Sequence, residues 1–227
     1  MIIITGASRG VGAYLFNKYE STGEKVFGTY NLTKPKNTKE NGVYHQVNVV
    51  NYEEVENWIN KIGDLNEVTL INCAGISYNS FAHKSDVEKW KNVIDVNLIG
   101  TYNVIRAVLV HMRENNFGRI INFASVAAQK GTPGISAYSA SKSALWGLSK
   151  SIAVENATKG ITINNINLGY SELGMIEEVP EKYKEIIKSQ IPNGEFCKKE
   201  DIFKCVEFVR NNEYLNGSSI DLNGGIF

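Results

Sequence analysis

Two hydrophobic patterns alternate along the chain. Short apolar runs, such as residues 2–4, are typical of strands that are buried on both faces of a parallel sheet. Between these runs lie longer stretches, such as residues 52–62, in which Val55, Ile59 and Ile62 recur at helical spacing. Because strands and helices follow one another along the chain, we predict an α/β fold in which helices cover both faces of a parallel sheet.

The same patterns predict the extent of each element. Strands are expected at residues 2–4, 25–30, 43–48, 67–73, 119–123, 161–168 and 218–222. Helices are expected at residues 13–21, 52–62, 85–113, 138–156 and 201–209. Ser85 and Glu88 have capping-box spacing, which marks the start of the long helix, and the polar stretch 31–42 is predicted to be a loop. We therefore expect seven strands in a single domain that spans residues 1–227.

Composition narrows the classes of function. The 227 residues suffice for one α/β domain with a good core, but not for a separate substrate domain. Lys and Arg together number 24, as do Asp and Glu, so no bulk charge favours a nucleic acid or an anionic membrane as partner. Cys73, Cys197 and Cys205 cannot all pair and lack metal-ligand spacing, so we expect free thiols, no metal and a cytoplasmic protein. We expect no signal peptide, because the first strand begins at residue 2, and no membrane helix, because no apolar run approaches about 20 residues.

The segment between the first strand and the first helix is rich in glycine. Gly6, Gly10 and Gly12 allow a tight turn and a close approach of the backbone to a pyrophosphate. The following helix presents free N–H groups and the positive end of its dipole to such a group. The spacing differs from the Gly-x-Gly-x-x-Gly of most dinucleotide folds, but the strand before it and the helix after it favour a Rossmann-type, doubly wound sheet that binds a dinucleotide.

A second set of residues has the chemistry to reduce a carbonyl. Tyr138 and Lys142 are four residues apart and share one face of a helix. A fixed cation beside the phenol is expected to lower the pKa of Tyr138 from its usual value near ~10, which prepares it to exchange a proton with a substrate oxygen. Ser125 is a candidate to hydrogen-bond the same oxygen.

These candidates follow predicted strands. Gly6, Asn72, Ser125 and Gly169 come after four separate strands, and ligands of open parallel sheets bind at the carboxyl ends of the strands. We therefore expect the fold to assemble one site at this edge.

The chain resembles the short-chain dehydrogenase/reductase family, in its compact single-domain form, over essentially its whole length. The resemblance rests on the turn at 5–12, the motif Asn72-Cys73-Ala74-Gly75 (with Cys73 in place of a second Asn), Asn97, Ser125, Tyr138, Lys142 and the run Asn223-Gly224-Gly225. Within the family, residues 118–122 and the motif Gly131-x-Pro133-Gly134 are most similar to the 3-oxoacyl-[acyl-carrier-protein] reductases.

The resemblance implies roles for individual residues. Asn97, Ser125, Tyr138 and Lys142 match the catalytic tetrad, and at Asn97 family members bend a helix so that a freed carbonyl holds a water beside the lysine. Cofactor contacts are implied for Gly6, Ser8, Arg9, Gly10, Val11, Gly12, Asn31, Asn48, Val49, Asn72, Ala74, Gly75, Tyr138, Lys142, Gly169 and Ser171. Asn48 stands where many members hold the adenine amino group with Asp, and its alternative role is that of a turn residue at a strand end.

The choice of cofactor depends on the end of the second strand. Members that prefer NAD place an acid there, whereas residues 28–31 of this chain contain none. Arg9 in the glycine turn, with Lys34 as a second candidate, suits a 2′-phosphate, so we expect NADP(H).

One segment departs from the family. Leu168 replaces the usual Pro after the sixth strand, and Leu173 replaces a Thr that binds the nicotinamide amide, so that contact is left to backbone groups or to Ser171. Residues 171–196 correspond to a mobile substrate lid, which excludes water when it closes.

The sequence predicts an oxidoreductase that transfers hydride between NADP(H) and a carbonyl or secondary alcohol. Two alternatives remain open: a reductase of sugar, polyol or surface-polysaccharide metabolism, suggested by the segment 168–175, and a nucleotide-binding sensor or scaffold without turnover. The partner is expected to be a small molecule. A homotetramer or homodimer is also expected, because two long helices carry apolar stripes. The stripe residues are Val104, Val108 and His111 on one helix and Leu145, Leu148 and Ile152 on the other.

Overall fold

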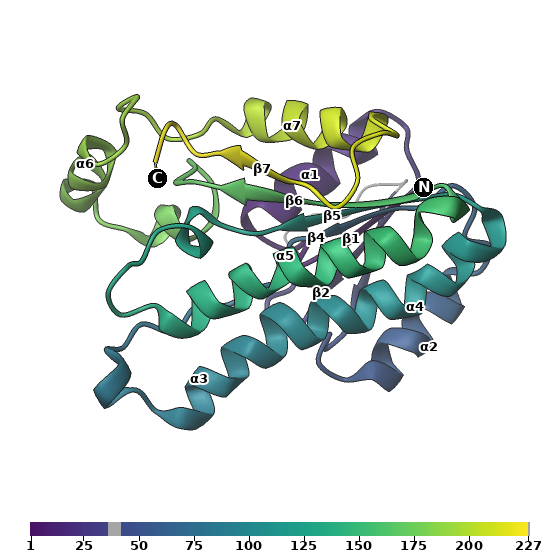
Figure 1. Ribbon diagram of the computed structural model, residues 1–227, viewed down its shortest axis with the longest axis horizontal. Coiled ribbons are helices and arrows are strands. Elements are labelled where there is room, and N and C mark those ends of the chain that lie inside the picture. The colour runs from purple at the N-terminus through teal and green to yellow at the C-terminus, as the bar shows by residue number, and fades with distance from the viewer. Residues whose placement is uncertain (36–41, 227) are drawn as a thin grey trace.

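The computed structural model describes residues 1–35 and 42–226, and one parallel sheet runs through its centre (Figure 1). The seven strands lie in the order β3-β2-β1-β4-β5-β6-β7, so the strand order reverses between β1 and β4. Their bounds are β1 (Ile2–Thr5), β2 (Val26–Tyr30), β3 (Gly42–Gln46), β4 (Thr69–Asn72), β5 (Gly118–Phe123), β6 (Ile161–Leu168) and β7 (Ser219–Leu222). The predicted seven-stranded, doubly wound Rossmann-type fold is confirmed.

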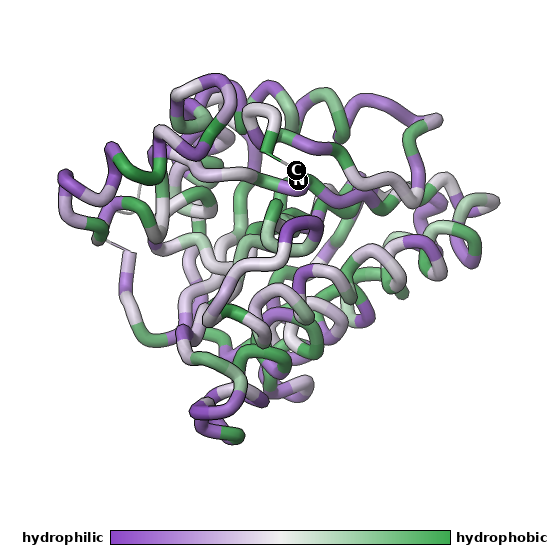
Figure 2. Tube along the Cα trace, turned by 60° about the vertical axis from the view of Figure 1, so that its left-hand side comes forward, coloured by the Kyte–Doolittle hydropathy of each residue, from purple (hydrophilic) through white to green (hydrophobic). Residues whose placement is uncertain are grey.

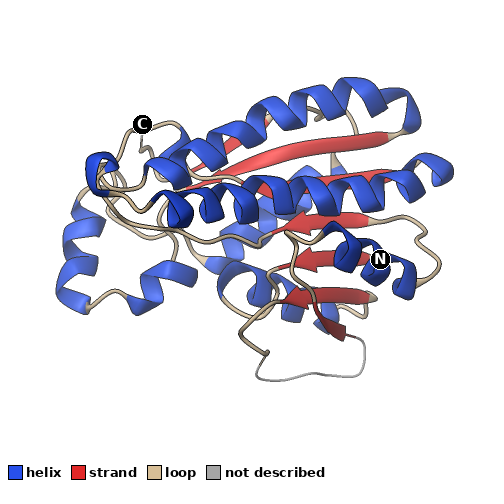
Figure 3. Ribbon diagram, turned by 90° about the horizontal axis from the view of Figure 1, so that it is seen from below, coloured by secondary structure: helices blue, strands red, loops and turns tan. Residues whose placement is uncertain are grey.

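Helices cover both faces of the sheet (Figures 1 and 3). One face carries α1 (Gly10–Ser21) and α7 (Lys199–Asn211). The other carries α2 (Tyr52–Ile62), α4 (Gly100–Asn115) and α5 (Ser136–Asn156). The helix α3 (Val87–Ile94) leads into α4, and α6 (Glu181–Ser189) projects beyond the carboxyl ends of the strands.

The side chains of each strand point alternately to the two faces of the sheet, and both faces are covered by helices. This explains why the apolar runs are continuous. Ile3 and Leu70 pack against the α2, α4 and α5 layer, whereas Ile4 and Ile71 pack against the α1 and α7 layer. Successive side chains point to opposite faces, so a strand that is covered twice needs apolar residues at every position. Figure 2 shows the resulting hydrophobic stretches in the middle of the molecule.

Several helix ends differ from the sequence prediction. The helix α1 begins at Gly10 rather than at residue 13, so the last two glycines of the turn belong to its first turn. The predicted cap at Ser85 is wrong, because the Asp86 side chain accepts the 3.0 Å hydrogen bond from the Lys89 amide and caps α3. The short helix α6 was not predicted, and residues 36–41 of the predicted loop lie outside the described residues.

The continuous helical stretch Val87–Asn115 is long and apolar enough to cross a membrane by length and composition alone. Half of its apolar window is buried inside the fold, however. Val93, Val104 and Val108 have no exposed surface. The hydropathy of this stretch is therefore explained by its packing in the core.

Candidate active site

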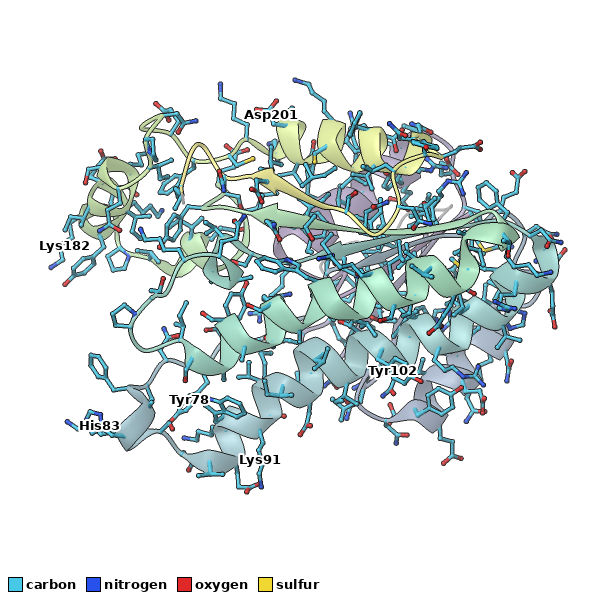
Figure 4. The ribbon with its side chains drawn as sticks, viewed as in Figure 1. Tyr78, His83, Lys91, Tyr102, Lys182 and Asp201 are labelled. Carbon is cyan, nitrogen blue, oxygen red and sulfur yellow. The ribbon has the colours of Figure 1, made fainter. Side chains whose placement is uncertain are left out.

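The candidate residues meet at the carboxyl edge of the sheet, as expected. The parallel register places Thr5 beside Asn72 and Asn72 beside Asn122, so the segments that follow β1, β4 and β5 leave the sheet together. Gly169 follows β6 at the same edge, where its amide donates to the Leu222 carbonyl at 2.9 Å. Side chains of the loop after β4 and of α6, among them His83 and Lys182, project beyond this edge (Figure 4).

The glycine turn is held against the end of β2. The Gly6 amide donates to the Thr29 hydroxyl at 3.2 Å, and the Ala7 amide donates to the Thr29 carbonyl at 2.7 Å. A side chain at Gly12 would collide with the Gly6 carbonyl, so this crossing of the backbone requires glycine. The first turn of α1 thus stands beside the last residues of β2, where the resemblance places the ribose.

The Tyr138 and Lys142 side chains are brought together on α5. The Lys142 ammonium lies 5.8 Å from the centre of the Tyr138 ring and donates a 2.6 Å hydrogen bond to the Phe123 carbonyl at the end of β5. Lys142 is only 6% exposed. Ser125 begins the short turn η3 (Val126–Ala128), and its hydroxyl accepts from the Ala127 amide. The site therefore combines a phenol, an ammonium and a hydroxyl within an enclosed region.

Burial governs the protonation of this set. Burial raises the pKa of Tyr138, while its hydrogen bond with Ser125 lowers it. Burial lowers the pKa of Lys142 to about 8, and the neighbouring Cys73 opposes that shift. The expected lowering of the Tyr138 pKa is wrong for this arrangement, because the ammonium points to the Phe123 carbonyl and burial of the phenol dominates.

The residue Asn97 lies in a π-helical turn, η2 (Asp95–Ile99), between α3 and α4. The expected irregularity of the helix at this residue is thus present. The Asn97 side chain accepts from the Ile76 amide at 2.8 Å and donates to the Ile76 carbonyl at 2.9 Å and the Ser141 hydroxyl at 3.0 Å. Ser141 in turn donates to the Tyr138 carbonyl at 2.8 Å, so Asn97 ties the loop after β4 to the first turns of α5.

Sequence reasoning missed Ser141 and Thr29. Ser141 could have been found because it lies three residues after Tyr138. In a helix a Ser hydroxyl commonly donates to a carbonyl three or four residues earlier. Thr29 had no such signal, because its partners Gly6 and Ala7 are far away in the sequence.

The segment after β4 borders the lysine. A side chain at Gly75 would lie 3.3 Å from the Asn97 side-chain oxygen and 3.6 Å from the Lys142 ammonium. The Cys73 thiol packs against the apolar cluster under α1 and α7, and burial raises its pKa to about 12. The thiol is therefore neutral near pH 7, which suits its packing among apolar side chains.

Other predicted cofactor residues lie at or near this edge, but some of their side chains are turned elsewhere. The Asn72 amide is engaged within the sheet, bonded to Thr5 and Asn122. The Asn48 oxygen accepts from the Val50 amide at 3.2 Å, which is the contact of a strand-end turn residue. The remaining predicted residues are Ser8, partly exposed; Arg9 and Asn31, exposed; Val11, packed on the α1 and α7 layer; Val49, buried; and Ala74, whose amide donates to the Thr5 hydroxyl.

The lid segment is joined at its two ends by a parallel bridge between Ser171 and Cys197. Its Ser171 hydroxyl donates to the Leu173 carbonyl at 3.0 Å. A side chain at Gly10 would lie 2.9 Å from Gly174, so the lid rests directly against the glycine turn. The lid therefore contacts the glycine turn, which the resemblance assigns to the cofactor.

A doubly wound parallel sheet with a glycine turn and a Ser, Tyr, Lys and Asn set at one edge defines a Rossmann-type oxidoreductase. The chain matches the family described as short chain dehydrogenase over residues 1–184, and it belongs to that family. It is an oxidoreductase that acts on carbonyl or CH–OH groups with a nicotinamide cofactor.

Named relatives refine this assignment. The chain is 36% identical to an acetoacetyl-CoA reductase of Shinella zoogloeoides, over 99% of this chain and 97% of the relative. It is 35% identical to a 3-oxoacyl-[acyl-carrier-protein] reductase of Rickettsia typhi, over 99% and 95% respectively. A crystal structure of the 3-oxoacyl-[acyl-carrier protein] reductase from Brucella melitensis superimposes with a TM-score of 0.89 over 99% of this chain and 90% of that one, at 24% identity, and supports the fold.

Proposed function

We propose that the protein is an NADP(H)-dependent reductase of 3-oxoacyl thioesters. The observation that carries this proposal is the meeting of Ser125, Tyr138, Lys142 and Asn97 beside the glycine turn, at one edge of the sheet. The two relatives are named for acetoacetyl-CoA and for a 3-oxoacyl group on a carrier protein, and both substrates are thioesters with a ketone at the third carbon.

The glycine turn suits a dinucleotide, because Gly12 lets the backbone cross closely over Gly6 and the first turn of α1 has N–H groups without helical partners. A bound nicotinamide would supply the hydride to the ketone carbon. Ser125 holds the ketone oxygen by a hydrogen bond, and Tyr138 gives that oxygen its proton. A phenol whose pKa is raised by burial is fully protonated near neutral pH and is ready to act as the acid.

Lys142 is placed to restore the proton that Tyr138 loses. As Tyr138 becomes a phenolate, the nearby ammonium stabilises the new negative charge. The lowered pKa of Lys142, about 8, makes this ammonium a better proton donor than an ordinary lysine.

Turnover by the wild-type protein tests the proposal. When purified protein is mixed with NADPH and acetoacetyl-CoA, the absorbance of the reduced nicotinamide is expected to fall. The rate of this fall is expected to be higher with NADPH than with NADH. A panel of keto sugars and simple ketones separates the thioester proposal from the sugar or polyol alternative. Binding of NADPH without turnover of any ketone would favour the non-catalytic sensor and contradict the proposal.

Replacing Arg9 with Ala is expected to weaken NADPH binding while barely changing NADH binding. Arg9 is exposed at the N-terminus of α1, and residues 28–31 at the neighbouring end of β2 contain no acid. Loss of a charge-assisted contact costs roughly 1.5–3 kcal/mol, or about 10- to 150-fold in the NADPH dissociation constant. Cofactor titration by fluorescence measures both constants, with Lys18→Ala as a control for charge removal elsewhere on α1. Equal losses for the two cofactors would refute the role of Arg9.

We also propose that the protein is a cytoplasmic homodimer or homotetramer. Its subunit interface is expected on a different surface from the one that the sequence predicted. Of the predicted stripe residues, Val104, Val108 and Ile152 are buried in the core cluster against the sheet, and Leu145 is also buried, so these residues do not form the predicted subunit surface. The outer face of α4 exposes Tyr102, by 44%, as Figure 4 shows. Val110 on the same helix is 40% exposed, and Val154 on α5 is 84% exposed. A self-complementary apolar patch suits a two-fold interface.

Light scattering at micromolar concentration is expected to give a mass of two or four chains. A mass near 25.2 kDa would show a monomer and contradict the proposal. Val154→Lys is expected to lower the mass, because it places a charge on the exposed face of α5.

A further inference from the structure

A row of polar residues crosses the centre of the apolar sheet. Thr5, Asn72, Asn122, Asn165 and Ser219 occupy paired positions on the adjacent strands β1, β4, β5, β6 and β7. The first four are at most 3% exposed, and Asn122 and Asn165 have no exposed surface. We call these five residues the polar row.

Side-chain hydrogen bonds connect each member of the polar row to the next. Thr5 donates to the Asn72 oxygen at 3.4 Å, and the Asn72 amide donates to the Asn122 oxygen at 2.9 Å. The Asn122 amide donates to the Asn165 oxygen at 3.4 Å, and the Asn165 amide donates to the Ser219 hydroxyl at 3.1 Å. Each amide thus has its oxygen and its nitrogen engaged, which a buried amide requires.

The helix α5 joins the row through Ser149. Its hydroxyl accepts from the Asn122 amide at 3.1 Å and donates to the Asn165 oxygen at 2.9 Å, with no exposed surface. Ser149 lies about two turns after Lys142 and three after Tyr138, on the same face of the helix. Apolar contacts allow a helix to slide or rotate slightly on a sheet, whereas two directional hydrogen bonds at one hydroxyl do not.

The other end of the row reaches the nucleotide side of the site. The Thr5 hydroxyl accepts from the Ala74 amide at 3.2 Å, and Thr5 directly precedes Gly6 of the glycine turn. One buried network therefore links the glycine turn, the loop after β4 and the helix that carries the phenol and the ammonium.

We propose that Ser149, held by Asn122 and Asn165, positions α5 so that Tyr138 and Lys142 reach the substrate carbonyl. These three are positioning residues, because none of them touches the reacting atoms. The proposal rests on the proposed function, since it assigns Tyr138 and Lys142 the proton transfer.

The chain offers a matched control beside Asn165. Asn164 is equally buried, and its side chain points to the opposite face of the sheet. Its amide donates to the Leu215 carbonyl at 2.7 Å and its oxygen accepts from the Ser218 amide at 2.9 Å. Replacing Asn164 therefore removes a buried amide comparable to that of Asn165. The hydrogen bonds that are lost with Asn164 do not involve α5.

The experiment compares Asn165→Ala with Asn164→Ala at a temperature at which circular dichroism shows both to be folded. Asn165→Ala is expected to lower kcat by about 10- to 100-fold, as small misplacements of reacting groups do, with a much smaller change in KM for NADPH. Asn164→Ala is expected to keep kcat near the wild-type value although its melting temperature falls. Equal losses of kcat in both variants, or no loss in Asn165→Ala, would overturn the proposal.

Ser149→Ala tests the same contact from the helix, and it removes only one oxygen atom. It is expected to lower kcat, and the double variant with Asn165→Ala is expected to lose less than the product of the two single losses, because both single variants lose the Ser149–Asn165 contact. The exposed Ser151→Ala, on the same helix, controls for the better helix propensity of alanine and should leave kcat unchanged.

Hydrogen exchange separates this proposal from the proposed function. Amides around Tyr138 and Lys142 are expected to exchange faster in Ser149→Ala than in Ser151→Ala or the wild type. A wild-type protein that reduces no ketone contradicts the proposed function alone. Unchanged exchange in Ser149→Ala contradicts the positioning role, whatever the wild-type activity.

Discussion

Tyr138→Phe is expected to lower kcat for ketone reduction by ~10²–10⁴-fold, the usual contribution of general acid catalysis. The phenol of Tyr138 is buried, is hydrogen-bonded with Ser125 and carries the proton that the proposal gives to the ketone oxygen. The ring remains in the variant, so packing on α5 and the affinity for NADPH should change little. Steady-state kinetics and cofactor titration measure the two effects separately.

The fully exposed Tyr214 provides a control for loss of a tyrosine hydroxyl, and Tyr214→Phe should retain wild-type kcat. If Tyr138→Phe kept more than about a tenth of the wild-type rate, the assignment of Tyr138 as the acid would fail.

Lys142→Met is expected to abolish most turnover and to leave the protein at least as stable as the wild type at pH 7. The side chain is 6% exposed, and burial of its ammonium lowers the pKa of Lys142 to about 8. Replacing a buried ion by an apolar side chain of similar volume is often neutral or stabilising by roughly 1–4 kcal/mol. The carbonyl of Phe123 loses its donor, which costs about 1–3 kcal/mol and limits the gain.

The pH dependence of this stability difference has a definite sign. Below pH 8 Lys142 is charged in both the folded and the unfolded chain, so the folded state bears the whole cost of burying the ammonium. Between pH 8 and the usual lysine pKa of ~10.4, the unfolded chain still binds the proton that the folded chain has lost, so the wild type gains stability as pH rises. The advantage of Lys142→Met should therefore shrink across this window.

Urea unfolding at pH 7 and pH 10 measures the difference, with Lys150→Met as a control, because Lys150 is exposed on the same helix. A Lys142→Met variant that is less stable than the wild type at pH 7, or an advantage that grows with pH, would contradict the expected cost of the buried ammonium.

The strands were predictable because their signal is local. The strand β6 has the predicted bounds, Ile161–Leu168, and the other strands differ from the prediction by at most two residues at either end. A strand covered on both faces must be apolar along its length, and that requirement is visible in the sequence without knowledge of its partners. Helix starts were less certain, because Ser85 and Asp86 are both good caps and only the backbone geometry selects Asp86.

The sequence did not show to the same degree which neighbour covers the apolar face of each helix. Val104 and Ile152 lie on apolar stripes that suit either a sheet or a second subunit, and only the packing of α4 and α5 shows that they belong to the core cluster against the sheet. The short helix α6 carries Tyr183, Ile186 and Ile187 at helical spacing, but it spans only Glu181–Ser189 and none of its residues is buried, so these apolar positions do not mark a core helix.

By itself, the sequence determined the parallel α/β fold and the candidate reaction, because the apolar runs, the glycine turn and the spacing of Tyr138 and Lys142 are properties of short segments. The tertiary structure decided what depends on distances between remote segments. It directs the Lys142 ammonium to Phe123 and makes burial the dominant influence on the pKa of Tyr138. It also brings Asn122 and Asn165 of the sheet into hydrogen-bond contact with Ser149 of α5. Desolvation and hydrogen bonding act over a few ångströms in space, so residues far apart in the chain acquire these properties only when the sheet brings them together.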